Sequence, residues 1–369
     1  MLKNTKSRLC AIAVSVIALT ALAASPAMAD PSPSGSFKPL SGVGSDTIQD
    51  VMNGVASVVP AIGSYDAVDP ATLVAGGLIQ TKSGGAQFVR PNGSGQGVQA
   101  LSDSIQGGTH LWNNVNILNQ VDFARSSSGV SVTGTQLNYI PMAQDAVTFA
   151  VNQGSDFPRN IPLGSSADAA NKLSLYNIYH CITTTYTDSN LSTVTIHPLI
   201  PQAGSGTRSF WLGKMGLTEA SIVGTCVKDV NTDGTSVQEH DGTALTDPGD
   251  IAPFSISQFI AQGNHKAITT AYGVNLVERK GQAALGAVNG ISPIRMSAGK
   301  TVSNGAFPIN RLVYNVVSAA RAANTTDAIN TTFVGSTSSV CSQGALIAAF
   351  GFSTIANCGA TNITSGFTQ

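Results

Sequence analysis

The sequence has 369 residues, with 19 basic and 20 acidic side chains, a formal net charge of −1 and a hydrophobic fraction of 42%. This balance supplies no basic surface for nucleic acid, and an apolar chain with only 11% charged residues is not disordered. The length exceeds what one compact core usually occupies, so we expect two lobes.

The N-terminal segment is typical of an export signal. Residues 1–8 carry three basic side chains, residues 9–24 are apolar, and Ala27-Met28-Ala29 forms the small-x-small pattern of a signal-peptidase site. We therefore expect residues 1–29 to be a signal peptide and cleavage to occur before Asp30. The apolar run is short for a membrane anchor, and no cysteine at the cleavage point would carry a lipid. The prediction is a secreted protein, extracellular or periplasmic and not lipid-anchored.

Four cysteines lie beyond this segment, and an even number in an exported chain predicts disulfides. They are Cys181, Cys226, Cys341 and Cys358. Pairing between sequence neighbours, 181 with 226 and 341 with 358, is favoured because short loops close at low entropic cost. A metal site is the alternative, although no two of these cysteines have CxxC spacing.

After a Pro/Ser linker over residues 30–36, strands and helices alternate around Gly/Ser turns, which predicts an α/β fold. The predicted strands are 88–90, 121–125, 146–152 and 195–200, and the predicted helices are 48–59, 98–101, 173–182 and 210–215.

The recurring unit is strand, Gly/Ser turn and helix. It occurs at residues 42–47, 93–97 and 204–207, and a related turn spans 125–129. Each helix start offers unpaired N–H groups and the positive end of a dipole, and glycine allows a ligand to approach the backbone. Several such ends in one cleft would hold a small oxyanion. Ordinary capped turns of an α/β protein are the alternative reading.

The ordered set of segments resembles the substrate-binding proteins of phosphate ABC transporters, in the type II periplasmic-binding-protein superfamily. The matching segments are Gly42-Val43-Gly44-Ser45-Asp46-Thr47, Gly93-Ser94-Gly95-Gln96-Gly97-Val98, Asp122 to Ser127, Ile140 to Asn152, Gly204-Ser205-Gly206-Thr207, Pro248 to Ile251 and Phe307 to Tyr314. The resemblance implies a two-lobe α/β fold with a ligand cleft between the lobes. Lobe 1 would comprise residues 30–142 and 257–369, and lobe 2 residues 143–256.

The resemblance also implies which residues contact the anion. These are Asp46, Thr47, Ser94, Ser205, Gly206 and Thr207. The family's ligand-facing Asp aligns with Ser127, its Arg with Pro201 and a neighbouring Asp with Ala203. We therefore expect Arg125 or Arg208 to supply the positive charge, with an ion pair elsewhere as the alternative role for each.

A second pattern, D-x-N-x-D-G, begins at Asp229 and continues through Asn231 and Asp233. It matches the first half of an EF-hand-type calcium loop. The twelfth position holds His240 where a bidentate Glu is required, with Glu239 beside it. A structural calcium ion is one expectation, and an Asx-rich turn beside a disulfide is the other.

The sequence thus predicts a secreted, monomeric solute-binding protein that captures a small oxyanion, phosphate first, for an ABC permease. It is expected not to be an enzyme, to require no cofactor and to bind no nucleic acid. Two alternatives are a calcium-stabilised surface or interaction protein on the same fold and a secreted phosphoester hydrolase. The hydrolase is disfavoured because Ser94 and Ser205 lack a Gly-x-Ser-x-Gly context and the histidines form no metal-binding pair.

Overall fold

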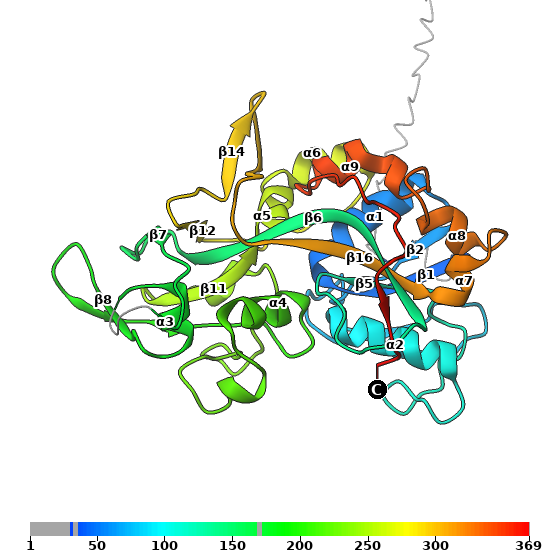
Figure 1. Cartoon of the computed structure of the whole chain (residues 1–369), viewed down its shortest axis with the longest axis horizontal. Helices are drawn as coiled ribbons and strands as arrows, with labels where there is room; N and C mark the ends of the chain where they lie inside the picture. Colours follow the sequence, from blue (N-terminus) through cyan, green and yellow to red (C-terminus); the bar gives the residue numbers. More distant parts are fainter. Residues whose placement is uncertain (1–29, 32–35, 168–171, 369) are drawn as a thin grey trace, which may run out of the picture.

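A nine-stranded mixed sheet runs through the whole molecule in the computed structural model, which describes residues 30–31, 36–167 and 172–368 (Figure 1). The strand order is β10-β11-β6-β16-β5-β1-β2, and β12 and β17 also pair with β6. Their bounds are β1 Leu40–Gly44, β2 Ile62–Ser64, β5 Phe123–Ser126, β6 Leu137–Asn152, β10 His197–Pro198, β11 Asp250–Ser255, β12 Ala283–Leu285, β16 Asn310–Ser318 and β17 Thr364–Ser365. The predicted signal peptide, 1–29, lies outside the described residues.

Helices and short strand pairs surround this sheet. The helices are α1 Gln49–Val58, α2 Ser94–Gln106, α3 Leu175–Tyr179, α4 Gly206–Met215, α5 Ile256–Gly263, α6 His265–Tyr272, α7 Ala319–Ala323, α8 Ala328–Phe333 and α9 Gly344–Ala349. Single 3-10 turns are η1 Asp46–Ile48, η2 Ala220–Ile222, η3 Gly242–Ala244 and η4 Cys341–Gln343. The paired short strands are β3 Leu78–Ile79 with β4 Phe88–Val89, β7 Asn160–Ile161 with β13 Ala287–Val288, β8 Thr185–Thr187 with β9 Thr193–Thr195, and β14 Ile294–Ser297 with β15 Lys300–Ser303.

Strands β6 and β16 connect the two halves of the molecule. They pair antiparallel from Asn310 opposite Ala146 to Ser318 opposite Leu137, with a register shift between Val313 and Tyr314. Nearly every residue of β6 is buried, so both faces of this strand are covered. Figure 1 shows the pair running from the β1–β5 half into the β11 half.

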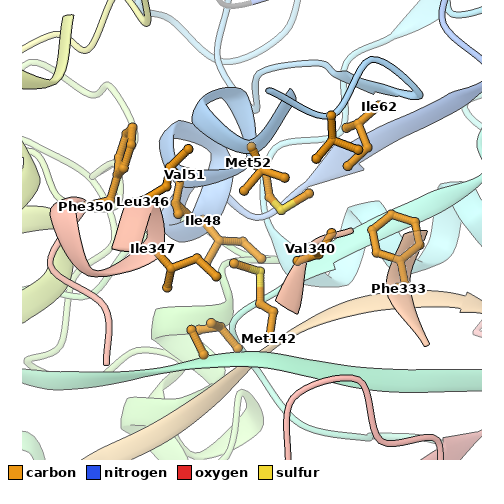
Figure 2. Close-up of a cluster of buried hydrophobic side chains, with 14 of the residues drawn as sticks. Ile48, Val51, Met52, Ile62, Met142, Phe333, Val340, Leu346, Ile347 and Phe350 are labelled. Atoms are coloured by element: carbon orange, nitrogen blue, oxygen red, sulfur yellow. The ribbon is translucent and has the colours of Figure 1, made fainter. Parts of the chain in front are cut away.

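Each half has its own apolar core. In the first half, Ile48, Val51 and Met52 beside α1 pack against Leu346 and Phe350 at α9 (Figure 2). In the second half, Phe149, Tyr179 and Trp211 belong to a separate core cluster. The predicted α/β class and two-lobe organisation are therefore confirmed, while the boundaries at 142/143 and 256/257 stay predictions.

Local sequence signals explain where two predicted elements are shorter than expected. The helix predicted over 173–182 is limited to α3, because the Ser174 side chain caps its start and Cys181 adopts a left-handed φ of 60° just beyond its end. The strand predicted over 195–200 is divided: Thr195 ends β9, and His197–Pro198 form β10 at the sheet edge, where Pro198 lacks an N–H to donate.

Both predicted disulfides are present, Cys181–Cys226 in the second half and Cys341–Cys358 beside α9. Across the residues described, no helix combines the length and the apolar character that crossing a bilayer requires.

Candidate functional site

The three predicted Gly/Ser turns meet at one place between the lobes. The turn after β1 leads into η1, and the other two precede α2 and α4. The Gly95 N–H donates to the Gly204 carbonyl at 3.0 Å, so the N-termini of α2 and α4 abut. A Cβ atom on Gly206 would lie 2.2 Å from Ser94 Oγ, which makes glycine necessary for this close approach.

Four buried hydroxyl groups form the centre of this junction. Thr47 Oγ1 lies 3.1 Å from Ser127 Oγ and 3.3 Å from Thr207 Oγ1, and Ser94 Oγ lies 3.3 Å from Ser127 Oγ. We call Thr47, Ser94, Ser127 and Thr207 the hydroxyl cluster. Ser205 lies beside it and caps α4 by accepting the Arg208 N–H at 3.0 Å. The structure thus brings together Thr47, Ser94, Ser127, Ser205, Gly206 and Thr207.

The positive charge at the hydroxyl cluster belongs to Arg311, which the sequence analysis did not select. Its Nη2 donates to Thr47 Oγ1 at 3.3 Å, to Thr207 Oγ1 at 3.1 Å and to Asp145 Oδ2 at 2.8 Å. Asp145 is its cross-strand partner, since β16 places Arg311 opposite that residue on β6. An arginine within a segment rich in valine and tyrosine, which favours a strand, was the signal that could have identified it.

Glu239 is a second group that the sequence analysis did not place at the anion site. It is fully buried, and its Oε2 accepts from Thr47 Oγ1 at 2.7 Å and from Thr207 Oγ1 at 3.1 Å. His240 Nε2 lies 3.1 Å from the same oxygen. The Ser255 N–H donates to His240 Nδ1 at 3.4 Å, which assigns the imidazole proton to Nε2. This N–H is shared between Glu239 Oε2 and Thr47 Oγ1, which lies 3.0 Å away.

These donors determine the protonation of Glu239. Burial alone would raise its pKa. The hydrogen bond from His240, the Ser205 hydroxyl and the charge of Arg311 together lower the pKa of Glu239 to about 2. The carboxylate is therefore ionised at neutral pH and lies among the donors that the sequence had assigned to an external anion.

Asp46 lies next to this site but is engaged elsewhere. Both of its carboxylate oxygens accept from Arg279 Nη2, at 3.0 and 3.1 Å. Burial opposes the charge of Arg279, yet the neighbouring carboxylates of Asp46 and Asp50 raise the pKa of the guanidinium. This pair gives Asp46 a cation of its own, away from the hydroxyl cluster.

The two arginines that we expected to supply the anion's counter-charge do not contact the hydroxyl cluster. Arg125 is fully buried and donates to four backbone carbonyls, those of Gly42, Gly44, Ser45 and Tyr65. Burial lowers its pKa to about 10. Arg208 turns away to Glu219, at 2.7 Å, and Asp229, at 2.8 Å. The first arginine therefore organises the β1 turn, and the second forms the ion pair weighed as its alternative role.

The proposed calcium-loop residues bond to one another and to Arg208, although Asn231 Oδ1 has no hydrogen-bond partner among the described residues. Asp229 Oδ2 accepts from Arg208, Asp233 Oδ1 accepts from the Thr235 hydroxyl at 2.6 Å, and Asn231 Nδ2 donates to that hydroxyl at 3.0 Å. His240, at the twelfth position of the pattern, is buried beside Glu239 instead. Calcium binding at this loop stays a prediction.

A different group of buried acids lies behind η1, around a small cavity lined in part by Asp50, Asp66 and Arg279. Asp66 accepts one side-chain hydrogen bond, from Asn53 Nδ2 at 2.8 Å. Burial, followed by the charges of Asp50 and Asp30, raises the pKa of Asp66 to about 8. Burial and the charge of Asp46 likewise raise the pKa of Asp50 to about 6.

Comparison with known proteins gives structural likenesses at low sequence identity. A protein from Clostridium perfringens crystallised with bound phosphate is 12% identical, with a TM-score of 0.49 over 86% of this chain and 99% of that one. An ABC-type phosphate transport receptor from Vibrio cholerae is 17% identical, with a TM-score of 0.48 over 86% and 100%. A human phosphate-binding apolipoprotein is 13% identical, with a TM-score of 0.46 over 85% and 90%. No family model matches the chain, and no curated protein matches it significantly.

Proposed function

We propose that this protein binds a small oxyanion, phosphate first, in the cleft between its lobes. The observation that carries the proposal is the convergence of the hydroxyl cluster, the N-termini of α2 and α4, and the guanidinium of Arg311 at one buried place. Hydroxyl and backbone donors beside a helix start favour an anion, and arginine adds charge-assisted bonds.

The position of the donors fits a binding protein that closes around its ligand. Thr47 belongs to the first lobe, while Thr207 begins α4 in the second, and both contact Arg311. An anion held by both threonines would therefore couple binding to the relative position of the lobes. We propose that the exported protein delivers the anion to an ABC permease; two disulfides and the signal-like N-terminus support an oxidising location.

Calorimetric titration of the protein, processed at Asp30, with phosphate, sulfate and a phosphate monoester tests this function. We expect saturable binding of phosphate. Ser94→Ala should weaken it roughly two- to tenfold, because a neutral hydrogen bond contributes about 0.5–1.5 kcal/mol. Ser94 is the suitable probe because its Oγ already accepts the Ser127 N–H at 2.9 Å, which leaves its own proton for the cluster.

Ser342→Ala is the matched control, since that serine is exposed on η4, far along the chain from the cleft strands. It should bind phosphate like the wild type. The absence of saturable binding to all three ligands would refute the function. Steady release of phosphate from the ester would instead support the hydrolase alternative.

A further inference from the structure

The carboxylate of Glu239 has the environment that a bound anion would have. One of its oxygens, Oε2, receives hydrogen bonds from Thr47, Thr207 and His240, at 2.7, 3.1 and 3.1 Å. These donors come from η1, from the first turn of α4 and from the loop of Glu239 itself. An internal side chain therefore joins the same two lobes that an external ligand would join.

The donor spacing leaves no place for a second anion alongside this carboxylate. Thr47 Oγ1 and Thr207 Oγ1 are 3.3 Å apart, and Arg311 Nη2 reaches both. Glu239 Oε2 lies 2.7 and 3.1 Å from these two hydroxyls, within the range of a hydrogen bond, so it already fills the position that an anion oxygen would take between them. Two negative groups on the same donors would also repel one another.

Two basic side chains lie beside Glu239, namely Arg311 and His240. Arg311 on β16 is already paired with Asp145 on β6, and His240 is the neighbour in the loop. One guanidinium therefore serves two buried carboxylates. Glu239 Oε1 has no hydrogen-bond partner among the described residues, so only half of this carboxylate is satisfied.

The backbone beside Glu239 is held in an unfavourable conformation. His240 adopts a left-handed φ of 56°, a region that non-glycine residues rarely occupy and that often marks ligand clamps and switch segments. The conformation is maintained by Gln262 Nε2, which donates to the His240 carbonyl at 3.0 Å, and by the contact of the imidazole with Ser255.

We propose that Glu239 is the resident anion of the cleft: its carboxylate holds the lobes together in the absence of ligand, and a small oxyanion binds by displacing it. This inference rests on the proposed function and adds to it the residue that sets the affinity. The ligand competes with an intramolecular group, so the wild-type affinity is lower than the donors alone would give.

Two substitutions test the proposal with inorganic phosphate as the probe. Glu239→Gln removes the charge with little change in shape, and Glu239→Ala removes the whole competing group. Both should bind phosphate at least about tenfold more tightly than the wild type in calorimetric titration. Glu278→Gln is the control because Glu278 is exposed and paired with Lys280 at 3.7 Å, and it should match the wild type.

Small-angle X-ray scattering of the ligand-free proteins gives a reading that does not depend on phosphate. The wild type and Glu278→Gln should be compact, whereas Glu239→Ala should show a larger radius of gyration. Acetate, which restores a free carboxylate to the cleft, should return Glu239→Ala to the compact form and leave the wild type unchanged.

The outcomes separate the two proposals. If the wild type binds phosphate and neither Glu239 variant binds more tightly, the proposed function stands and the resident-anion inference is overturned. If no protein binds phosphate, the proposed function and the displacement step both fail. In that case the scattering tests the remaining claim. A larger radius of gyration for Glu239→Ala would support the role of the carboxylate in holding the lobes together, and an unchanged radius would contradict it.

Discussion

Two buried carboxylates, one in the cleft and one behind η1, differ sharply although both lie away from solvent. Glu239 is 0% exposed and Asp66 is 4% exposed. Three side chains donate to one oxygen of Glu239, whereas Asp66 accepts a single side-chain bond and lies near other acids. The pKa is accordingly about 2 for Glu239 and about 8 for Asp66. Burial sets the cost of a charge, and the number of donors decides whether the charge is kept.

The strongest test of this comparison removes the cation of the cleft. Arg311→Leu should lower the free energy of unfolding by about 3–5 kcal/mol, because it leaves Asp145 without its buried partner. Urea denaturation monitored by circular dichroism measures the change. Arg295→Leu, at an exposed position on β14, should stay within about 0.5 kcal/mol of the wild type. If Arg311→Leu lowered the free energy of unfolding by less than about 1 kcal/mol, Arg311 would not be needed to stabilise the buried carboxylates of the cleft.

The raised pKa of Asp66 should make the protein less stable as the pH rises. Its pKa rises from 3.8 to about 8 on folding, so between these values the folded state holds a proton that the unfolded state has released. Stability is therefore full below pH 4 and falls as pH rises towards 8, by up to about 1.4 kcal/mol per pH unit. Asp66→Asn should flatten this dependence and exceed the wild type most at pH 8. If the melting temperatures of the wild type and of Asp66→Asn changed equally between pH 5 and pH 8, the raised pKa of Asp66 would be contradicted.

The removal of one hydrogen-bond donor to Glu239 should destabilise the protein less than the removal of Arg311. Thr207→Val preserves the shape of the side chain but removes the hydroxyl that lies 3.1 Å from Glu239 Oε2. The loss should be about 1.5–3 kcal/mol, since the bond is to a charged group and Thr47 and His240 remain as donors. Thermal unfolding at neutral pH measures it, with exposed Thr270→Val as the control. If Thr207→Val and Thr270→Val were equally stable, the hydroxyl of Thr207 would not help to stabilise the ionised form of Glu239.

The hydroxyl half of the site could be predicted from the sequence, and the charged half could not. Thr47, Ser94 and Thr207 each follow a Gly/Ser turn that precedes a helix, and such turns meet where the strands end. Glu239 carries no local motif, because its role arises from contacts with residues 32 and 192 positions away along the chain.

Arg125 donates to backbone carbonyls instead of the hydroxyl cluster for a related physical reason. A guanidinium is expected to seek an anion, but five N–H donors can also be satisfied by carbonyl oxygens that a tight turn leaves unpaired. The four carbonyls that Arg125 reaches become neighbours only when β1, β2 and β5 are assembled. Arg311 was passed over because its partner Asp145 is fixed by the register between β6 and β16, which sequence periodicity does not specify.

The register shift between Val313 and Tyr314 has a mechanical consequence. Because β6 and β16 are continuous through both lobes, the cleft cannot swing open about a slack linker; the paired strands themselves must bend or twist. A register shift of this kind bends the strand and increases its twist locally, and Arg311 lies only two residues from Val313. A change of bend or twist at this point would therefore shift the guanidinium of Arg311 relative to the hydroxyl cluster, so the geometry of the anion site depends on the shape of the strand pair.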